Sequence, residues 1–152
     1  MPEKRTSHEE SAVATFLAAA RSMGIAPCRK EKVRLLGSTG FEFGDLRVDG
    51  QEGHVVLEVE SAGGSTNLAK YWHLIVAGHS VQPVFLIHVF RTGSPRDWMF
   101  HMDVWHTLVA RMHAELSERF HAELFTYDKR IGVTEAAPAV VRFREFVSAA
   151  VA

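Results

Sequence analysis

The sequence predicts a single α/β domain in which helices flank a mixed β-sheet. The chain has 152 residues, of which 47% are hydrophobic and 23% charged, so it can form one core but not comfortably two. Segments with the helical period of 3.6 residues alternate with short segments typical of strands. Residues 83–90 are almost continuously apolar, which is typical of a central strand buried on both faces.

The first predicted element is a helix over residues 8–23. Ser7 and Glu10 have the spacing of a capping box at its start, and apolar residues then recur at helical spacing. Gly24 is placed where a glycine commonly ends a helix, and Pro27 prevents the helix from continuing.

Three strands are expected next, over residues 32–36, 40–48 and 54–60. Gly44 lies inside the second of them and predicts a bulge, whereas Asp49-Gly50 is a turn sequence between the second and third. The short connections predict an antiparallel meander.

The rest of the chain is expected to alternate between helices and strands. The predicted elements are helix 66–78, strand 83–90, helix 101–119, strand 122–127 and helix 137–151. The expected apolar stripe of the first of these helices is Leu68, Tyr71, Trp72, Ile75 and Val76. A helix between two strands of one sheet implies a right-handed parallel crossover.

Composition restricts the functional classes. The net charge of −1 provides no global basic field, so nucleic acid would have to bind to local basic patches. The single Cys28 excludes a disulfide framework and a four-cysteine zinc site. No apolar segment is long enough to cross a membrane, so we expect a cytoplasmic protein without a membrane partner.

Strand 54–60 carries two acidic side chains on one face. Because side chains alternate along a strand, Glu58 and Glu60 should point one way and Val55, Leu57 and Val59 the other. Neighbouring carboxylates repel one another and are costly to desolvate, so a metal ion or a basic side chain is expected beside them.

The order αβββαβ over about residues 8–90, together with these acids, resembles the PD-(D/E)xK nuclease superfamily, which has the restriction-endonuclease-like fold. Asp45 lies on the second predicted strand, and Glu58-Val59-Glu60 occupies the tripeptide of the third. Glu60 departs from the pattern, because the family most often has lysine there; some of its restriction endonucleases have Glu-x-Glu. Residues of about 95–151 would be a C-terminal α-β-α extension within the same domain.

The resemblance implies a metal-dependent nuclease that acts on DNA. Asp45, Glu58 and the Val59 carbonyl would bind Mg²⁺, or Mn²⁺ in its place. Glu60 would position the attacking water or share a second metal ion. Lys70, on the helix that follows, would replace the missing lysine, since relocated lysines occur in the family.

Alternatives are open for each of these residues. Glu58 and Glu60 could line the solvated face of an edge strand, and Lys70 could be a solvated helix residue. Glu9 could reach the site from the first helix or merely favour the helix start. A catalytically inactive binding module on the same fold is the competing function, and a homodimer stays open. Basic clusters that could track phosphates are Arg29, Lys30, Lys32 and Arg34, then Lys129 and Arg130, then Arg142 and Arg144.

Overall fold

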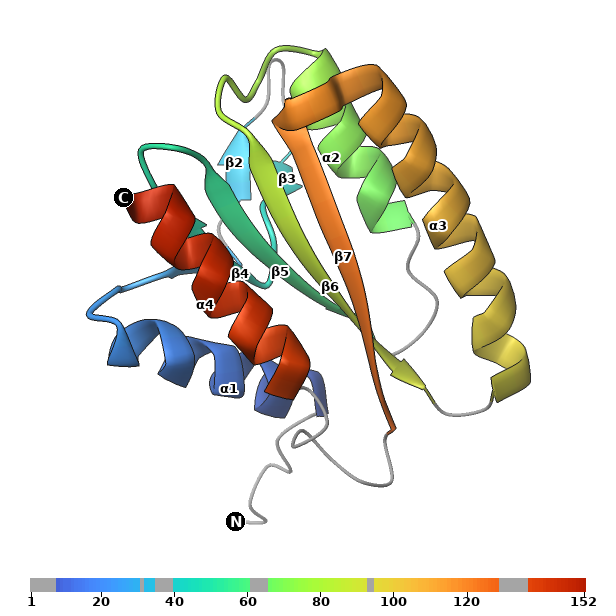
Figure 1. Cartoon of the computed structure of the whole chain (residues 1–152), viewed down its shortest axis with the longest axis horizontal. Helices are drawn as coiled ribbons and strands as arrows, with labels where there is room; N and C mark the ends of the chain where they lie inside the picture. Colours follow the sequence, from blue (N-terminus) through green and yellow to red (C-terminus); the bar gives the residue numbers. More distant parts are fainter. Residues whose placement is uncertain (1–7, 31, 35–39, 61–65, 93–94, 129–136) are drawn as a thin grey trace.

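A computed structural model describes residues 8–30, 32–34, 40–60, 66–92, 95–128 and 137–152 (Figure 1). Its helices are α1 (His8–Ser22), α2 (Thr66–Val76), α3 (Pro95–Leu116), the 3₁₀ helix η1 (Ser117–Arg119) and α4 (Ala137–Val151). Its strands are β1 (Cys28–Arg29), β2 (Lys32–Arg34), β3 (Gly40–Glu42), β4 (Leu46–Asp49), β5 (His54–Glu60), β6 (Val84–Thr92) and β7 (Phe120–Asp128).

The main sheet is mixed, which confirms the predicted fold class. Its five strands have the order β1-β4-β5-β6-β7. The β1–β4 and β4–β5 pairs are antiparallel, whereas the β5–β6 and β6–β7 pairs are parallel. The parallel pairing of β5 with β6 confirms the expected parallel relation across α2.

Helices cover both faces of this sheet, and each face has its own core. Figure 1 shows α1 and α4 on one face and α2 and α3 on the other. Strand β5 supplies both cores by alternation: Val55, Leu57 and Val59 are buried toward α1 and α4. Val56 is buried toward α2 and α3, and Glu58 contacts Tyr71 of α2 on that same face. The predicted division of side chains along this strand is therefore confirmed.

The predicted helices differ from the observed ones mainly in one place. Helices 8–23, 66–78 and 137–151 are confirmed to within two residues. The third helix begins at Pro95 instead of residue 101, because proline is well tolerated in the first turn of a helix. Its predicted last turn is the separate 3₁₀ helix η1.

The predicted apolar stripe of α2 was wrong at two positions. The exposed fractions of Trp72 and Val76 are 40% and 57%, whereas Leu74 is buried. The buried residues of the helix are Leu68, Tyr71, Leu74 and Ile75, so the buried stripe is rotated about the helix axis relative to the predicted one.

The single predicted strand over residues 40–48 was also wrong, because Gly44 divides it. Gly44 has a φ of +81°, which is a left-handed conformation that suits glycine. As a result β3 pairs with β2 in a separate two-stranded sheet, while β4 pairs with β5. Residues 35–36 of the first predicted strand lie outside the described residues. Asp45 follows the break directly, and its backbone N–H donates to the Leu57 carbonyl at 2.9 Å.

We expect Gly44→Ala to destabilise the fold more than Gly24→Ala. Both glycines have positive φ, +81° and +75°, so either change carries a backbone penalty of about 1–2 kcal/mol. A Cβ at Gly44 would also lie 2.5 Å from Val56 Cγ1, whereas a Cβ at Gly24 would meet no atom within 4 Å. Overpacking of this kind costs about 1–3 kcal/mol more.

Urea unfolding of the two variants measures this difference directly, with Gly24→Ala as the control for backbone strain. Equal losses of unfolding free energy would show that the β3–β4 break tolerates a side chain.

None of the helices in the described part of the chain is both long and apolar enough to span a bilayer.

Candidate functional site

Polar side chains surround a cavity of about 410 Å³ that includes the end of β5. We call it the acidic pocket. Its lining residues are Glu9, Lys30, Glu42, Asp45, Glu58, Val59, Glu60, Asn67 and Lys70. Segments that are far apart in sequence therefore meet here: α1, the β1 end, β3, β5 and the first turns of α2.

Asp45 and Glu58 come from neighbouring antiparallel segments. Asp45 immediately precedes β4, and its Oδ2 accepts a hydrogen bond from the Val59 backbone N–H at 2.8 Å. This bond fixes the Asp45 carboxylate against the strand that carries Glu58. Glu58 is only 4% exposed, so its carboxylate lies inside the molecule and not on a solvated edge strand.

Two residues of α2 hold the Glu58 carboxylate. Lys70 Nζ lies 2.6 Å from Glu58 Oε1, and the Tyr71 hydroxyl donates a hydrogen bond to the same oxygen. The Lys70 side chain is 25% exposed, so its ammonium group faces the pocket as well as its partner. Because helical neighbours lie about 100° apart, Tyr71 is buried while Lys70 stays at the rim.

Glu60 lies between a donor on α2 and a ring on β6. Asn67 Nδ2 donates a hydrogen bond to Glu60 Oε1. His88 Nε2, from the middle of β6, lies 3.5 Å from that oxygen. The Glu60 side chain is 14% exposed, so it is also largely withdrawn from solvent.

Burial raises the pKa of all three carboxyl groups. For Asp45 the Val59 N–H and the charge of Lys30 oppose the rise, and for Glu58 Lys70 and Tyr71 oppose it. Burial raises the pKa of Glu60 to about 7, with further contributions from the charges of Asp45 and Glu9. The pocket therefore favours added positive charge, either protons or cations.

The donor chemistry of the pocket suits a hard divalent cation, which prefers oxygen ligands. The contacts of these groups run through Asp45 Oδ2, Glu58 Oε1 and Glu60 Oε1, and all three carboxylates line the pocket. However, in the described ranges no three or more His, Cys, Asp and Glu side chains form a ready metal-binding group. Side chains would have to rearrange for a metal ion to acquire a full protein ligand set.

The structure brings together all five residues predicted for the site: Asp45, Glu58, Val59, Glu60 and Lys70. Glu9 and Lys30 also reach the pocket, whereas Arg142 pairs with Glu123 and Glu145 elsewhere. Lys129 and Arg130, and the side chains of Lys32 and Arg34, lie outside the described residues.

Tyr71, His88 and Trp105 were missed by sequence reasoning. Tyr71 looked like a member of an apolar stripe, and its position one residue after Lys70 gave no sign of a contact with Glu58. His88 approaches Glu60 from β6, and Trp105 of α3 contacts His88; no local pattern in the sequence indicates either contact.

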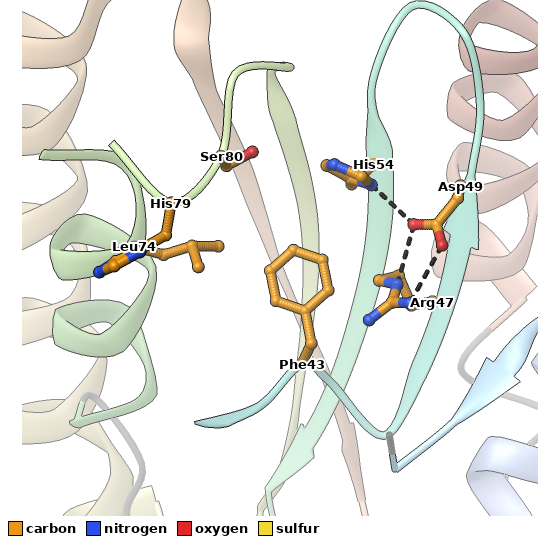
Figure 2. A pocket seen from close by; sticks show the side chains of 7 residues that line it. All are labelled: Phe43, Arg47, Asp49, His54, Leu74, His79 and Ser80. Atoms are coloured by element: carbon orange, nitrogen blue, oxygen red, sulfur yellow. Dashed lines mark hydrogen bonds and ion pairs between the residues drawn. The ribbon is translucent and has the colours of Figure 1, made fainter. Parts of the chain in front are cut away.

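A second cavity, of about 160 Å³, adjoins the first residue of β5 (Figure 2). Arg47 donates two hydrogen bonds to Asp49, at 2.8 and 3.0 Å, and His54 Nδ1 lies 2.6 Å from Asp49 Oδ1. The Arg47 guanidinium also lies over the Phe43 ring, 4.7 Å from its centroid. These charged groups satisfy one another, as expected of a network that stabilises the β4–β5 hairpin.

Comparisons of the chain with protein-family models, with curated proteins and with solved structures find no match. The resemblance to PD-(D/E)xK nucleases therefore stays a prediction. The geometry and charges of the acidic pocket are the observations from which a function can be inferred.

Proposed function

We propose that this protein is a metal-dependent nuclease that hydrolyses phosphodiester bonds, with DNA as the expected substrate. The observation that carries the proposal is the convergence of Asp45, Glu58 and Lys70 in one pocket, with Lys70 Nζ 2.6 Å from the Glu58 carboxylate. The Lys70 ammonium group supports the proposal because it provides a cation beside a Glu-x-Glu tripeptide that lacks the lysine of the family pattern.

Asp45 and Glu58, with the Val59 carbonyl, would hold Mg²⁺ or Mn²⁺. When bound, such an ion supplies Lewis-acid polarisation of the phosphate and a more acidic water. Lys70 has three N–H donors and can direct one toward a phosphate oxygen while another keeps the contact with Glu58. Glu60, with a pKa of about 7, can accept a proton from water at neutral pH.

The charge of the pocket makes cations a requirement for substrate binding. Five carboxyl groups and two lysines line it, so the pocket alone repels a polyanion. We therefore expect DNA binding at this site to depend on divalent cations and on protonation of the carboxyl groups.

A catalytically inactive binding module is the second candidate. It is favoured by the ion pair of Glu58 with Lys70 and by the lack of a ready three-ligand group in the described residues. In that case the ion pair would be a structural feature of the α2–β5 contact.

The direct test is cleavage of supercoiled plasmid, single-stranded DNA and RNA in the presence of Mg²⁺ or Mn²⁺. We expect the wild type to cleave DNA and Asp45→Asn/Glu58→Gln to be slower by about 10²-fold or more, the usual effect of removing preorganised electrostatic groups. Glu118→Gln, which removes an exposed carboxylate of η1, is the matched control and should leave the rate unchanged.

A thermal-shift titration with the same metal ions separates the two candidates. At a metal concentration ten times Kd, binding should stabilise the fold by about 1.4 kcal/mol, or roughly 3–6 °C in Tm. A shift without cleavage favours the inactive module. If the protein shows no cleavage and no thermal shift with either metal ion, the metal site itself is contradicted.

A further inference from the structure

His88 is a buried polar residue beside the acidic pocket. It lies in the middle of β6, is 0% exposed, and faces the core between the sheet and helices α2 and α3. In the parallel register of β5 and β6 it pairs with Glu58, so Glu60 is its diagonal neighbour on the same face.

Trp105 of α3 determines which nitrogen of His88 carries the proton. Its indole Nε1–H can only donate, and it donates to His88 Nδ1 at 2.9 Å. Nδ1 therefore presents a lone pair, and a neutral His88 ring carries its proton on Nε2. Burial lowers the pKa of His88 to about 4, so the ring is neutral at neutral pH.

The Nε2–H group of His88 lies near Glu60, which lines the acidic pocket, but it makes no hydrogen bond to a described residue. Nε2 is buried and has no hydrogen-bond partner among the described residues, and Glu60 Oε1 is 3.5 Å away. A buried donor without a partner loses its hydrogen bond to water and gains none in return, so such groups are rare in folded proteins. A small movement of Glu60 toward β6 would form the missing hydrogen bond.

We propose that His88 is a positioning residue for Glu60, with its tautomer fixed by Trp105 and its Nε2–H held ready for the Glu60 carboxylate. The Asn67 amide and the His88 N–H approach the same Glu60 oxygen. A hydrogen bond from His88 would therefore hold this carboxylate in the pocket together with Asn67. Its effect on cleavage rests on the proposed nuclease function, but the approach of His88 Nε2 to Glu60 does not.

Matched substitutions at His88 test the role in catalysis. The amide of His88→Gln can still accept from Trp105 and donate to Glu60, whereas His88→Phe fills the space and can do neither. We expect His88→Phe to lower kcat or the Mn²⁺ affinity by about 10–100-fold, as loss of an outer carboxylate partner usually does. His88→Gln should restore most of that loss, and the exposed His73→Gln should have no effect.

If His88→Gln and His88→Phe lose kcat or Mn²⁺ affinity equally while the fold is intact, His88 only fills space, and the proposal is overturned. No loss in His88→Phe would overturn it as well.

Nitrogen-15 NMR of the His88 ring tests its contacts with Trp105 and Glu60 without an activity measurement. We expect Nε2 to be protonated and Nδ1 unprotonated in the wild type, and Glu60→Ala to move the Nε2 resonance. In Trp105→Phe the ring should become a mixture of tautomers.

A wild-type ring protonated on Nδ1, or an Nε2 resonance unmoved by Glu60→Ala, would overturn the proposal. The NMR measurements can be made even if the wild type cleaves no substrate. They therefore distinguish a failure of the positioning role of His88 from a failure of the nuclease function.

Discussion

Lys70→Met is expected to lower the rate of DNA cleavage by about 10²–10³-fold, the effect of removing one preorganised charge from a transition state. Lys70 is ion-paired with Glu58 at 2.6 Å, and its side chain is only 25% exposed. In the proposed mechanism this charge would stabilise the negative charge that develops on the phosphate. Single-turnover cleavage rates with saturating Mn²⁺ measure the effect apart from metal binding.

Lys30→Met is the matched control, because Lys30 also lines the pocket and carries the same charge. Lys30 acts on Asp45 through its charge alone, so we expect its loss to lower the rate no more than about tenfold. Equal effects of the two variants would indicate a general electrostatic contribution and would contradict a specific role for Lys70.

The double variant Glu60→Lys/Lys70→Met tests whether the lysine has been relocated. It restores the Glu-x-Lys tripeptide on β5 and removes the lysine of α2. Recovery of part of the rate lost in Lys70→Met would support the family resemblance. A rate lower than that of Lys70→Met would show that Glu60 has a function of its own.

The second large effect is a loss of stability as the pH rises from about 4.5 to 7. Folding raises the pKa of Glu60 from 4.5 to about 7, so the folded state binds more protons between these values. The stabilisation from proton binding is complete below the unfolded-state pKa and is lost as the pH rises through the folded-state pKa. This shift in pKa corresponds to roughly 3 kcal/mol in the free energy of unfolding.

Urea unfolding of the wild type and Glu60→Gln across this pH range isolates the contribution of Glu60, because other titrating groups are common to both. We expect the wild type to lose more unfolding free energy than Glu60→Gln, and added Mg²⁺ to reduce the difference. Identical pH profiles would show that the Glu60 carboxyl is solvated. Glu118→Gln, on the surface, should behave as the wild type.

The parts of the fold that follow from local sequence were predicted well. The alternation of β5 placed Glu58 and Glu60 on one face, and the apolar segment of β6 identified a strand buried inside the sheet. The bulge predicted at Gly44 is a break between two strands, and a glycine in a strand pattern is compatible with both. Only the pairing of β3 with β2 distinguishes a bulge from a new sheet, and pairing is a long-range property.

The sequence predicted those residues of the candidate site that lie close together in the chain, between Asp45 and Lys70. Lys70 was included through the family resemblance, because relocated lysines occur on the helix that follows the tripeptide strand. Tyr71 and His88 were not, since an aromatic or a histidine in an apolar pattern is usually part of the core. Their hydrogen bonds depend on the register of β6 and on the docking of α3, which local patterns do not specify.

The packing of α1 against α4 has a consequence for the order in which the molecule assembles. Phe16 of α1 contacts Phe143 of α4, with ring centroids 5.5 Å apart, and Ala150 of α4 accepts a hydrogen bond from the β4–β5 turn. During synthesis α1 can already pack on β5, but its contacts with α4 form only once the last helix has been made. Contacts between such distant segments form slowly. We therefore expect the core between α1, α4 and the sheet to be completed in a late step of folding.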